Sequence, residues 1–232
     1  MLGMRADSGR RSAGMTGVLF IAGLAAGVFS VVPVIDGADY LVEASTHEHQ
    51  VLTGALFQLL MVVAYVGIPV LMYSILSKHS KGLALGSVAC GIMAGVFLMT
   101  GVILLLLLPT VSHEFVQAGA SNGSYFQTLG GLLREARDWV NHVATTLAFA
   151  WAMLLFNSVF YLAALIPRWL SVAGLIGSAL SIVASLLFMV RFIGLDAAYM
   201  MLNVPIALQQ LVLAVWLIVK GFNRTAIERR PI

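Results

Sequence analysis

Several polar side chains lie within or beside long apolar segments of this chain, where their chemistry stands out. Asp138, His142 and Thr145 follow one another at intervals of four and three residues, which places them on one face of a helix. A histidine beside a carboxylate can move protons, and with a cation such as Arg191 it can hold an anionic ligand. Two glutamines in other apolar segments add hydrogen-bonding amides. The candidate ligand-binding pocket therefore comprises Gln58, Asp138, His142, Arg191 and Gln210.

The composition defines the environment of these residues. Of the 232 residues, 60% are hydrophobic and only 10% are charged, and the mean hydropathy is +0.98. Soluble domains carry about 25% charged residues, so this chain could not cover a surface that faces water. The basic residues are not clustered as a binding face, which argues against a nucleic-acid partner. Membrane lipids are the expected surroundings, and the single Cys90 allows no intrachain disulfide.

Six segments are long and apolar enough to cross a bilayer, which takes roughly 20 residues for a core of about 30 Å. They predict an all-α, polytopic integral membrane bundle that forms one domain over residues 1–232. The predicted spans are residues 14–35, 51–76, 83–108, 140–166, 171–190 and 203–220. At 1.5 Å per residue, Gln58 and Gln210 then lie on the order of 10 Å below the outer boundary.

Basic residues indicate the orientation. With the N-terminus in the cytoplasm, the inner segments hold ten of the thirteen lysines and arginines, and the outer segments hold Arg134, Arg137 and Arg191. This bias follows the positive-inside rule and predicts that both termini are cytoplasmic. The candidate pocket then belongs to the outer half of the bundle.

Two outer segments are long. Residues 36–50 carry four carboxylates and two histidines, but His47 and His49 point to nearly opposite sides of a helix, so we predict a solvated acidic loop with no metal. In the second segment, residues 117–127 are typical of a loop. Residues 128–138 predict an outer interfacial helix or an N-terminal extension of the fourth span.

We expect no cofactor, because the chain has no phosphate-binding glycine loop, no paired-cysteine motif and no G-x-S-x-G.

The second half of the chain carries recognisable segments. "IPRWLS" at Ile166–Ser171 opens the fifth span, "PIAL" at Pro205–Leu208 lies in the sixth, and "WLIVKGF" at Trp216–Phe222 closes it. These segments resemble a bacterial multi-pass membrane family known only as domain of unknown function 4386. The resemblance implies a protein of the bacterial cytoplasmic (inner) membrane and implies no activity.

Three functions fit the sequence. The first is a non-enzymatic membrane protein that binds a lipid or small hydrophobic ligand in an outward-facing polar pocket, and this is the one we favour. The second is a membrane-embedded enzyme that acts from the outer leaflet through His142, Asp138 and Arg191. The third is a small permease, although no span carries a carboxylate near its middle, which coupled transporters are expected to need.

Overall fold

A computed structural model describes residues 2–119, 123–223 and 225 of the chain. Over these residues the chain forms helices and no strand, and six helices are long and apolar enough to cross a membrane. The predicted all-α bundle of six membrane-length helices is therefore confirmed.

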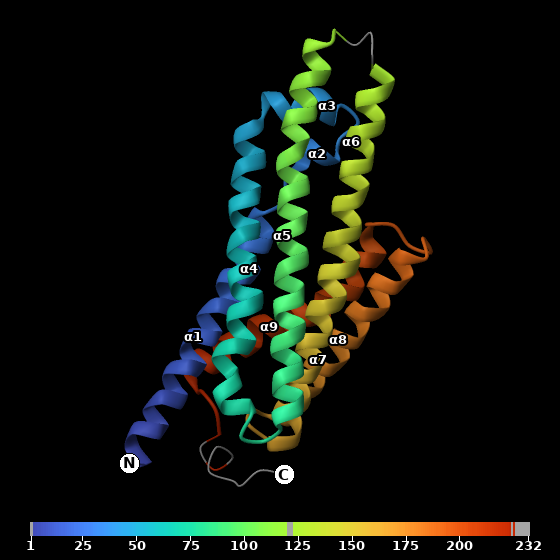
Figure 1. The fold of residues 1–232 in the computed structure, drawn as a ribbon. Helices are drawn as coiled ribbons and strands as arrows, with labels where there is room; N and C mark the ends of the chain where they lie inside the picture. The colour runs from blue at the N-terminus through green and yellow to red at the C-terminus, as the bar shows by residue number, and fades with distance from the viewer. Residues whose placement is uncertain (1, 120–122, 224, 226–232) are drawn as a thin grey trace.

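The elements follow one another with short connections (Figure 1). The membrane-length helices are built from α1 (Leu2–Phe29), α4 (Glu48–Leu76), α5 (Lys81–Gln117), α7 (Thr146–Ala163), α8 (Arg168–Met189) and α9 (Ala197–Val219). The remaining elements are α2 (Pro33–Asp36), α3 (Tyr40–Thr46), α6 (Gly123–Asp138) and the π-helix η1 (Trp139–Thr145).

The six long helices form a closed ring in the order of the sequence. Each packs against the next, from α4 to α5, α5 to α7, α7 to α8 and α8 to α9, and α1 closes the ring by packing against both α4 and α9. Consecutive helices run in opposite directions, so α1 begins and α9 ends at the same end of the bundle (Figure 1). We call the opposite end the outer end.

Two helices project beyond the others at the outer end. α5 has 37 residues, and α6, η1 and α7 join into a single helical rod whose membrane-length segment, Tyr125–Ala163, has 39. At 1.5 Å per residue, either rod is more than 50 Å long, while a bilayer core is about 30 Å thick. The described part of the loop expected at residues 117–127 is mostly helical, since α5 continues to Gln117 and α6 begins at Gly123, and the helix expected at residues 128–138 extends the fourth span. The two rods support each other by packing along α5, α6 and η1.

The acidic stretch at residues 36–50 is also more ordered than a solvated loop. α1 ends at Phe29, because Val32 precedes Pro33 and takes an extended conformation (φ −121°, ψ 84°). α2 and α3 follow, and both pack at the outer end near the projecting α5 (Figure 1). Arg134 of α6 donates to the carbonyl oxygens of Ile35 and Gly37 at 3.4 and 3.2 Å, which holds the end of α2 in place.

Buried apolar side chains form two clusters. The larger one fills the inner half of the ring with large side chains, including Phe156, Phe160 and Leu217. The smaller one joins α2, α4 and α5 at the outer end, around Ile35, Val51 and Leu105. The polar residues of the candidate pocket are found beside these clusters.

Candidate ligand-binding cavity

A cavity of about 640 Å³ lies in the outer half of the ring and is called the outer cavity here. One part of its wall comes from the end of α1, the linker after it, α2, α4 and α5. The other part comes from α6, η1, the start of α7, Leu195 and the first turns of α9. About 20 residues from Ala163 suffice to cross a bilayer core, which brings the fourth span to its outer boundary near His142. The cavity therefore surrounds the outer end of the expected fourth span.

Three deeply buried side chains of this wall keep a polar atom without a protein partner. Gln58, Thr145 and Arg137 are only 4%, 4% and 8% exposed. Within the described residues, Oε1 of Gln58, Oγ1 of Thr145 and Nε of Arg137 make no hydrogen bond to the protein. Buried polar atoms are almost always hydrogen-bonded, because losing water without a replacement costs on the order of 1–3 kcal/mol each. All three residues line the outer cavity, but the unpartnered atoms themselves are covered by protein. Water or a polar group in the cavity would reach them only after a small shift of these side chains.

His142 lies in the π-helix, where backbone carbonyls bond to side chains of neighbouring helices. Its carbonyl oxygen accepts from Ser185 Oγ of α8 at 2.9 Å and from Tyr199 Oη of α9 at 3.2 Å. Its ring packs edge-to-face against Tyr199 at 5.3 Å between centroids and against Phe188 at 6.2 Å. π-helical turns frequently occur at functional sites. Here the turn fixes His142 in the cavity wall by contacts with two other spans.

The first turn of α9 is shaped by a helix cap. Asp196 Oδ1 accepts from the backbone N–H groups of Ala198 and Tyr199 at 2.9 and 3.3 Å, and a cap of this kind fixes where a helix begins. Tyr199 and Asn203 of this helix line the outer cavity, and Asn203 Nδ2 donates to the Tyr199 carbonyl at 2.9 Å. The cap therefore sets the position of one wall.

The charged residues of the cavity are arranged around Arg137. Its Nη1 lies 3.7 Å from Oδ1 of Asp36 and 3.6 Å from Oδ1 of Asp138. Within the described chain, the Asp138 carboxylate and the His142 ring share no hydrogen bond, although their spacing suggested one. Asp138 ends α6 and His142 lies in η1, so the regular α-helical spacing does not continue between them. Their side chains line one cavity without forming a proton-relay pair.

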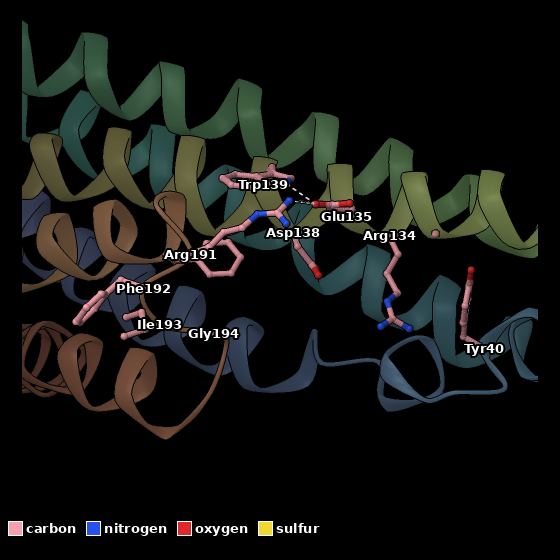
Figure 2. A pocket seen from close by; sticks show the side chains of 11 residues that line it. Tyr40, Arg134, Glu135, Asp138, Trp139, Arg191, Phe192, Ile193 and Gly194 are labelled. Carbon is pink, nitrogen blue, oxygen red and sulfur yellow. Dashed lines mark hydrogen bonds and ion pairs between the residues drawn. The ribbon is translucent and has the colours of Figure 1, made fainter.

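A second hollow, of about 600 Å³, lies beside α6 and is called the side pocket (Figure 2). Arg134 and Asp138 line both it and the outer cavity. Figure 2 shows Arg191 and Glu135 between Arg134 and Tyr40 on one side and the turn after α8 on the other. Burial raises the pKa of Tyr40, while the nearby Arg134 opposes that rise.

Arg191 belongs to the side pocket and not to the outer cavity. It follows the last turn of α8 with a positive φ of 56°, a left-handed conformation that often ends a helix. Its Nη2 donates to Glu135 Oε1 at 2.8 Å, and its guanidinium lies 6.0 Å from the centre of the Trp139 ring. The side chain is 74% exposed, so this ion pair links α8 to α6 in contact with solvent and contributes little by itself.

Gln210 lines a smaller and deeper hollow, which we call the inner cleft. Its neighbour Gln209 has a packing role, because Nε2 of Gln209 donates to Oδ1 of Asn157 at 3.2 Å and to the Leu170 carbonyl at 3.4 Å. The inner cleft and the outer cavity share Gly27, Met61 and Tyr65 in their walls. The two hollows therefore adjoin.

Of the five predicted pocket residues, the structure places Gln58, Asp138 and His142 in one cavity, Arg191 in the side pocket and Gln210 in the inner cleft. Arg137, Tyr65 and Asn203 also line the outer cavity and were not among the predicted residues. Arg137 had a detectable signal, because it is an arginine in an outer segment, against the positive-inside bias, and directly precedes a candidate residue. Tyr65 and Asn203 lie in apolar spans with nothing in the sequence to mark them.

The six membrane-length helices define a polytopic α-helical membrane protein, with a cavity in the outer half of its ring. Comparison with family models identifies the chain more closely, since residues 15–221 match the family described as "Domain of unknown function (DUF4386)". The chain belongs to this family. No curated protein and no solved structure matches it.

Proposed function

We propose that this protein binds a lipid or small hydrophobic ligand with a polar group in the outer cavity, from the outer side of a bacterial cytoplasmic membrane. The observation that carries the proposal is the set of unpartnered polar atoms on Gln58, Thr145 and Arg137, all deeply buried around one cavity. A protein keeps such an arrangement at a cost in stability unless a ligand supplies the missing hydrogen bonds.

The contacts support binding better than catalysis or transport. The His142 ring packs against aromatic rings, and Asp138 is paired with Arg137 at 3.6 Å, so neither is arranged as an acid–base pair. The inner half of the ring is filled mostly by large apolar side chains such as Phe156, Phe160 and Leu217, and the inner cleft that adjoins the cavity has only Tyr65 and Gln210 as polar side chains in its wall.

Replacing Gln58 with leucine tests the proposal. Gln58→Leu removes an unpartnered amide, so the ligand-free protein should gain stability, on the order of 1 kcal/mol. The same change should reduce the amount of lipid or ligand that stays with the purified protein. Native mass spectrometry measures retention, and thermal unfolding in detergent measures stability.

The matched control is Gln209→Leu. Gln209 is equally buried, at 4% exposed, and its Oε1 is also without a protein partner, but its Nε2 donates to Asn157 and Leu170 and the residue does not line the outer cavity. This variant should lose stability and retain the ligand as well as the wild-type protein does. If wild-type protein carries no bound molecule after mild extraction, or if Gln58→Leu retains as much as wild type, the proposal is overturned.

A further inference from the structure

The inner cleft has a different chemical character from the outer cavity. It has a volume of about 130 Å³ and lies between α1, α4, α7 and α9. Apart from Tyr65 and Gln210, its wall is made of glycines and apolar side chains, among them Phe20, Leu24 and Ala64. The cleft runs toward the apolar cluster of the inner half, since Phe20 and Ala64 belong to both.

Glycines of α1 provide the space for this cleft. Gly23 approaches α4 closely, because a Cβ atom there would lie 3.0 Å from Cβ of Ala64. One turn further along α1, a Cβ at Gly27 would be 3.7 Å from Cε of Met61, an ordinary contact. Gly27 lines both hollows, so the groove that begins in the polar outer cavity continues beside α1 into apolar surroundings.

The outer cavity also reaches the lipid-facing side of the ring. Val31, Leu195 and Met200 line it and are 63%, 41% and 66% exposed. Val31 follows α1, and Leu195 and Met200 flank the start of α9, so the exposed apolar side chains lie where these two neighbouring helices end. An opening bordered by exposed apolar side chains at the membrane boundary admits a molecule from the bilayer more readily than a solute from water.

Building on the proposed function, we infer that the ligand is a membrane glycerolipid, with its head group in the outer cavity and one acyl chain in the inner cleft. The polar cavity and the adjoining apolar cleft match the two parts of such a molecule. Arg137 Nε and Gln58 Oε1 are covered by protein, and a small shift of the two side chains would let the first donate to a phosphate oxygen and the second accept from a hydroxyl group. These two requirements favour a head group that carries both a phosphate and hydroxyl groups, as phosphatidylglycerol does.

The charges of the cavity are compatible with this head group. Asp36 and Asp138 both approach Nη1 of Arg137, at 3.7 and 3.6 Å, which leaves Nε for another acceptor. Arg134, which also lines the cavity, adds a second positive charge while it bonds to the carbonyls of α2. The carboxylates balance the arginines, so hydrogen-bond geometry and not net charge should select the lipid.

Photo-crosslinking tests where the acyl chain lies. Wild-type protein is placed in phosphatidylcholine nanodiscs that contain a small fraction of phosphatidylglycerol with a diazirine in the middle of one chain. After illumination, peptide mass spectrometry should locate label on cleft residues of α1 and α4, near Leu24 and Met61. Label spread evenly over lipid-facing side chains such as Val28 and Val63 would overturn the inference.

A substitution pair on α1 provides the matched comparison. Leu24→Trp fills the cleft, whereas Val28→Trp places the same side chain one turn away at a position that is 72% exposed and lines neither hollow. Cleft labelling should fall several-fold in Leu24→Trp and stay at the wild-type level in Val28→Trp. Equal labelling in the two variants contradicts the inference, and the wild-type map remains decisive if Leu24→Trp does not fold.

Competition with unlabelled lipids tests the head group. Phosphatidylglycerol should reduce cleft labelling more than phosphatidylcholine does, and equal competition would overturn the choice of a hydroxyl-bearing head group. The proposed function is judged separately by lipid retention in Gln58→Leu. If retention falls in that variant while labelling is uniform, only the position of the chain is wrong; if retention is unchanged and labelling is uniform, both proposals fail.

Discussion

Ser112 shows how one hydroxyl group can organise the outer end of the molecule. It is fully buried in α5, in the part of that helix that projects beyond the expected span. Its Oγ donates to the carbonyl oxygen of Leu41 at 2.5 Å and accepts from the backbone N–H of Ser45 at 2.9 Å. In a regular helix these two backbone groups would bond to each other. The hydroxyl therefore bonds to both backbone groups and fastens α3 to α5.

Ser112→Ala should loosen this connection. The substitution leaves the Leu41 carbonyl and the Ser45 N–H without their shared partner, and we expect a loss of about 1 kcal/mol in the free energy of unfolding. Ser178→Ala is the control, because Ser178 is also fully buried but donates only to the Gly174 carbonyl of its own helix, at 2.7 Å. Thermal unfolding in detergent measures both variants. Equal stability of the two would show that the bridge contributes nothing.

At the scale of elements, the π-helix η1 determines how the fourth span meets its neighbours. Asn141 of η1 points at Gly101 of α5, so closely that a Cβ atom at Gly101 would overlap its Oδ1. On the same rod, Asn157 of α7 fills the equivalent space at Gly174 of α8. Asparagine side chains facing glycines thus set the approach of the fourth span to the helices on both of its sides.

Gly101→Ala should therefore be destabilising, although alanine is the better helix former by about 1 kcal/mol. The new methyl group forces Asn141 to move within a packed interface, which we expect to cost about 1–3 kcal/mol. Adding Asn141→Ala removes the conflict, so the double variant should be more stable than Gly101→Ala alone in thermal unfolding. Gly14→Ala is the control, since nothing lies within 4 Å of a Cβ at that position. A Gly101→Ala protein as stable as this control would contradict the proposed contact.

The same elements show how far the sequence could predict the structure. Hydropathy located the six spans, because a bilayer demands long apolar helices whatever their contacts. It underestimated α5, which continues to Gln117, because polar residues beyond the membrane are helical through packing against α3 and α6 and not through apolar content. The π-helix leaves no trace in hydropathy, so the regular spacing of Asp138 and His142 suggested a pair that the structure does not form.

At the scale of the whole molecule, the ring explains why the cavity residues come from such distant parts of the chain. Because α1 closes the ring against α9, residues near position 30 and residues near position 200 form one wall. The sequence alone predicted how deep Gln58 and Gln210 lie in the membrane, but it did not predict which helix faces pack against each other. Gln58 reached the outer cavity, whereas Gln210 faces the inner cleft on the same side of the ring.

The expected orientation, with both termini in the cytoplasm, stays a prediction, and the ring places α1's start and α9's end at one end of the bundle, as that prediction requires (Figure 1). The three basic residues at the outer end depart from the positive-inside bias, yet each is engaged by the protein. Arg134 bonds to the end of α2, Arg137 lies beside Asp36 and Asp138, and Arg191 pairs with Glu135 at 2.8 Å. The positive-inside rule counts lysines and arginines whether or not they are paired, so the prediction still rests on the ten basic residues of the inner segments against these three.

Reporter fusions in a bacterial host test this orientation. Alkaline phosphatase is active only outside the cytoplasm, so a fusion after Asn223 should be inactive and a fusion after Gly119 should be active. A green fluorescent protein, which fluoresces when it folds in the cytoplasm, should give the opposite result at the same two sites. Replacing Arg191 by glutamine removes an outer charge and should leave both readings unchanged, because that charge is already paired with Glu135. If the fusion after Asn223 has phosphatase activity, the orientation is the reverse of the expected one and the cavity lies in the cytoplasmic leaflet.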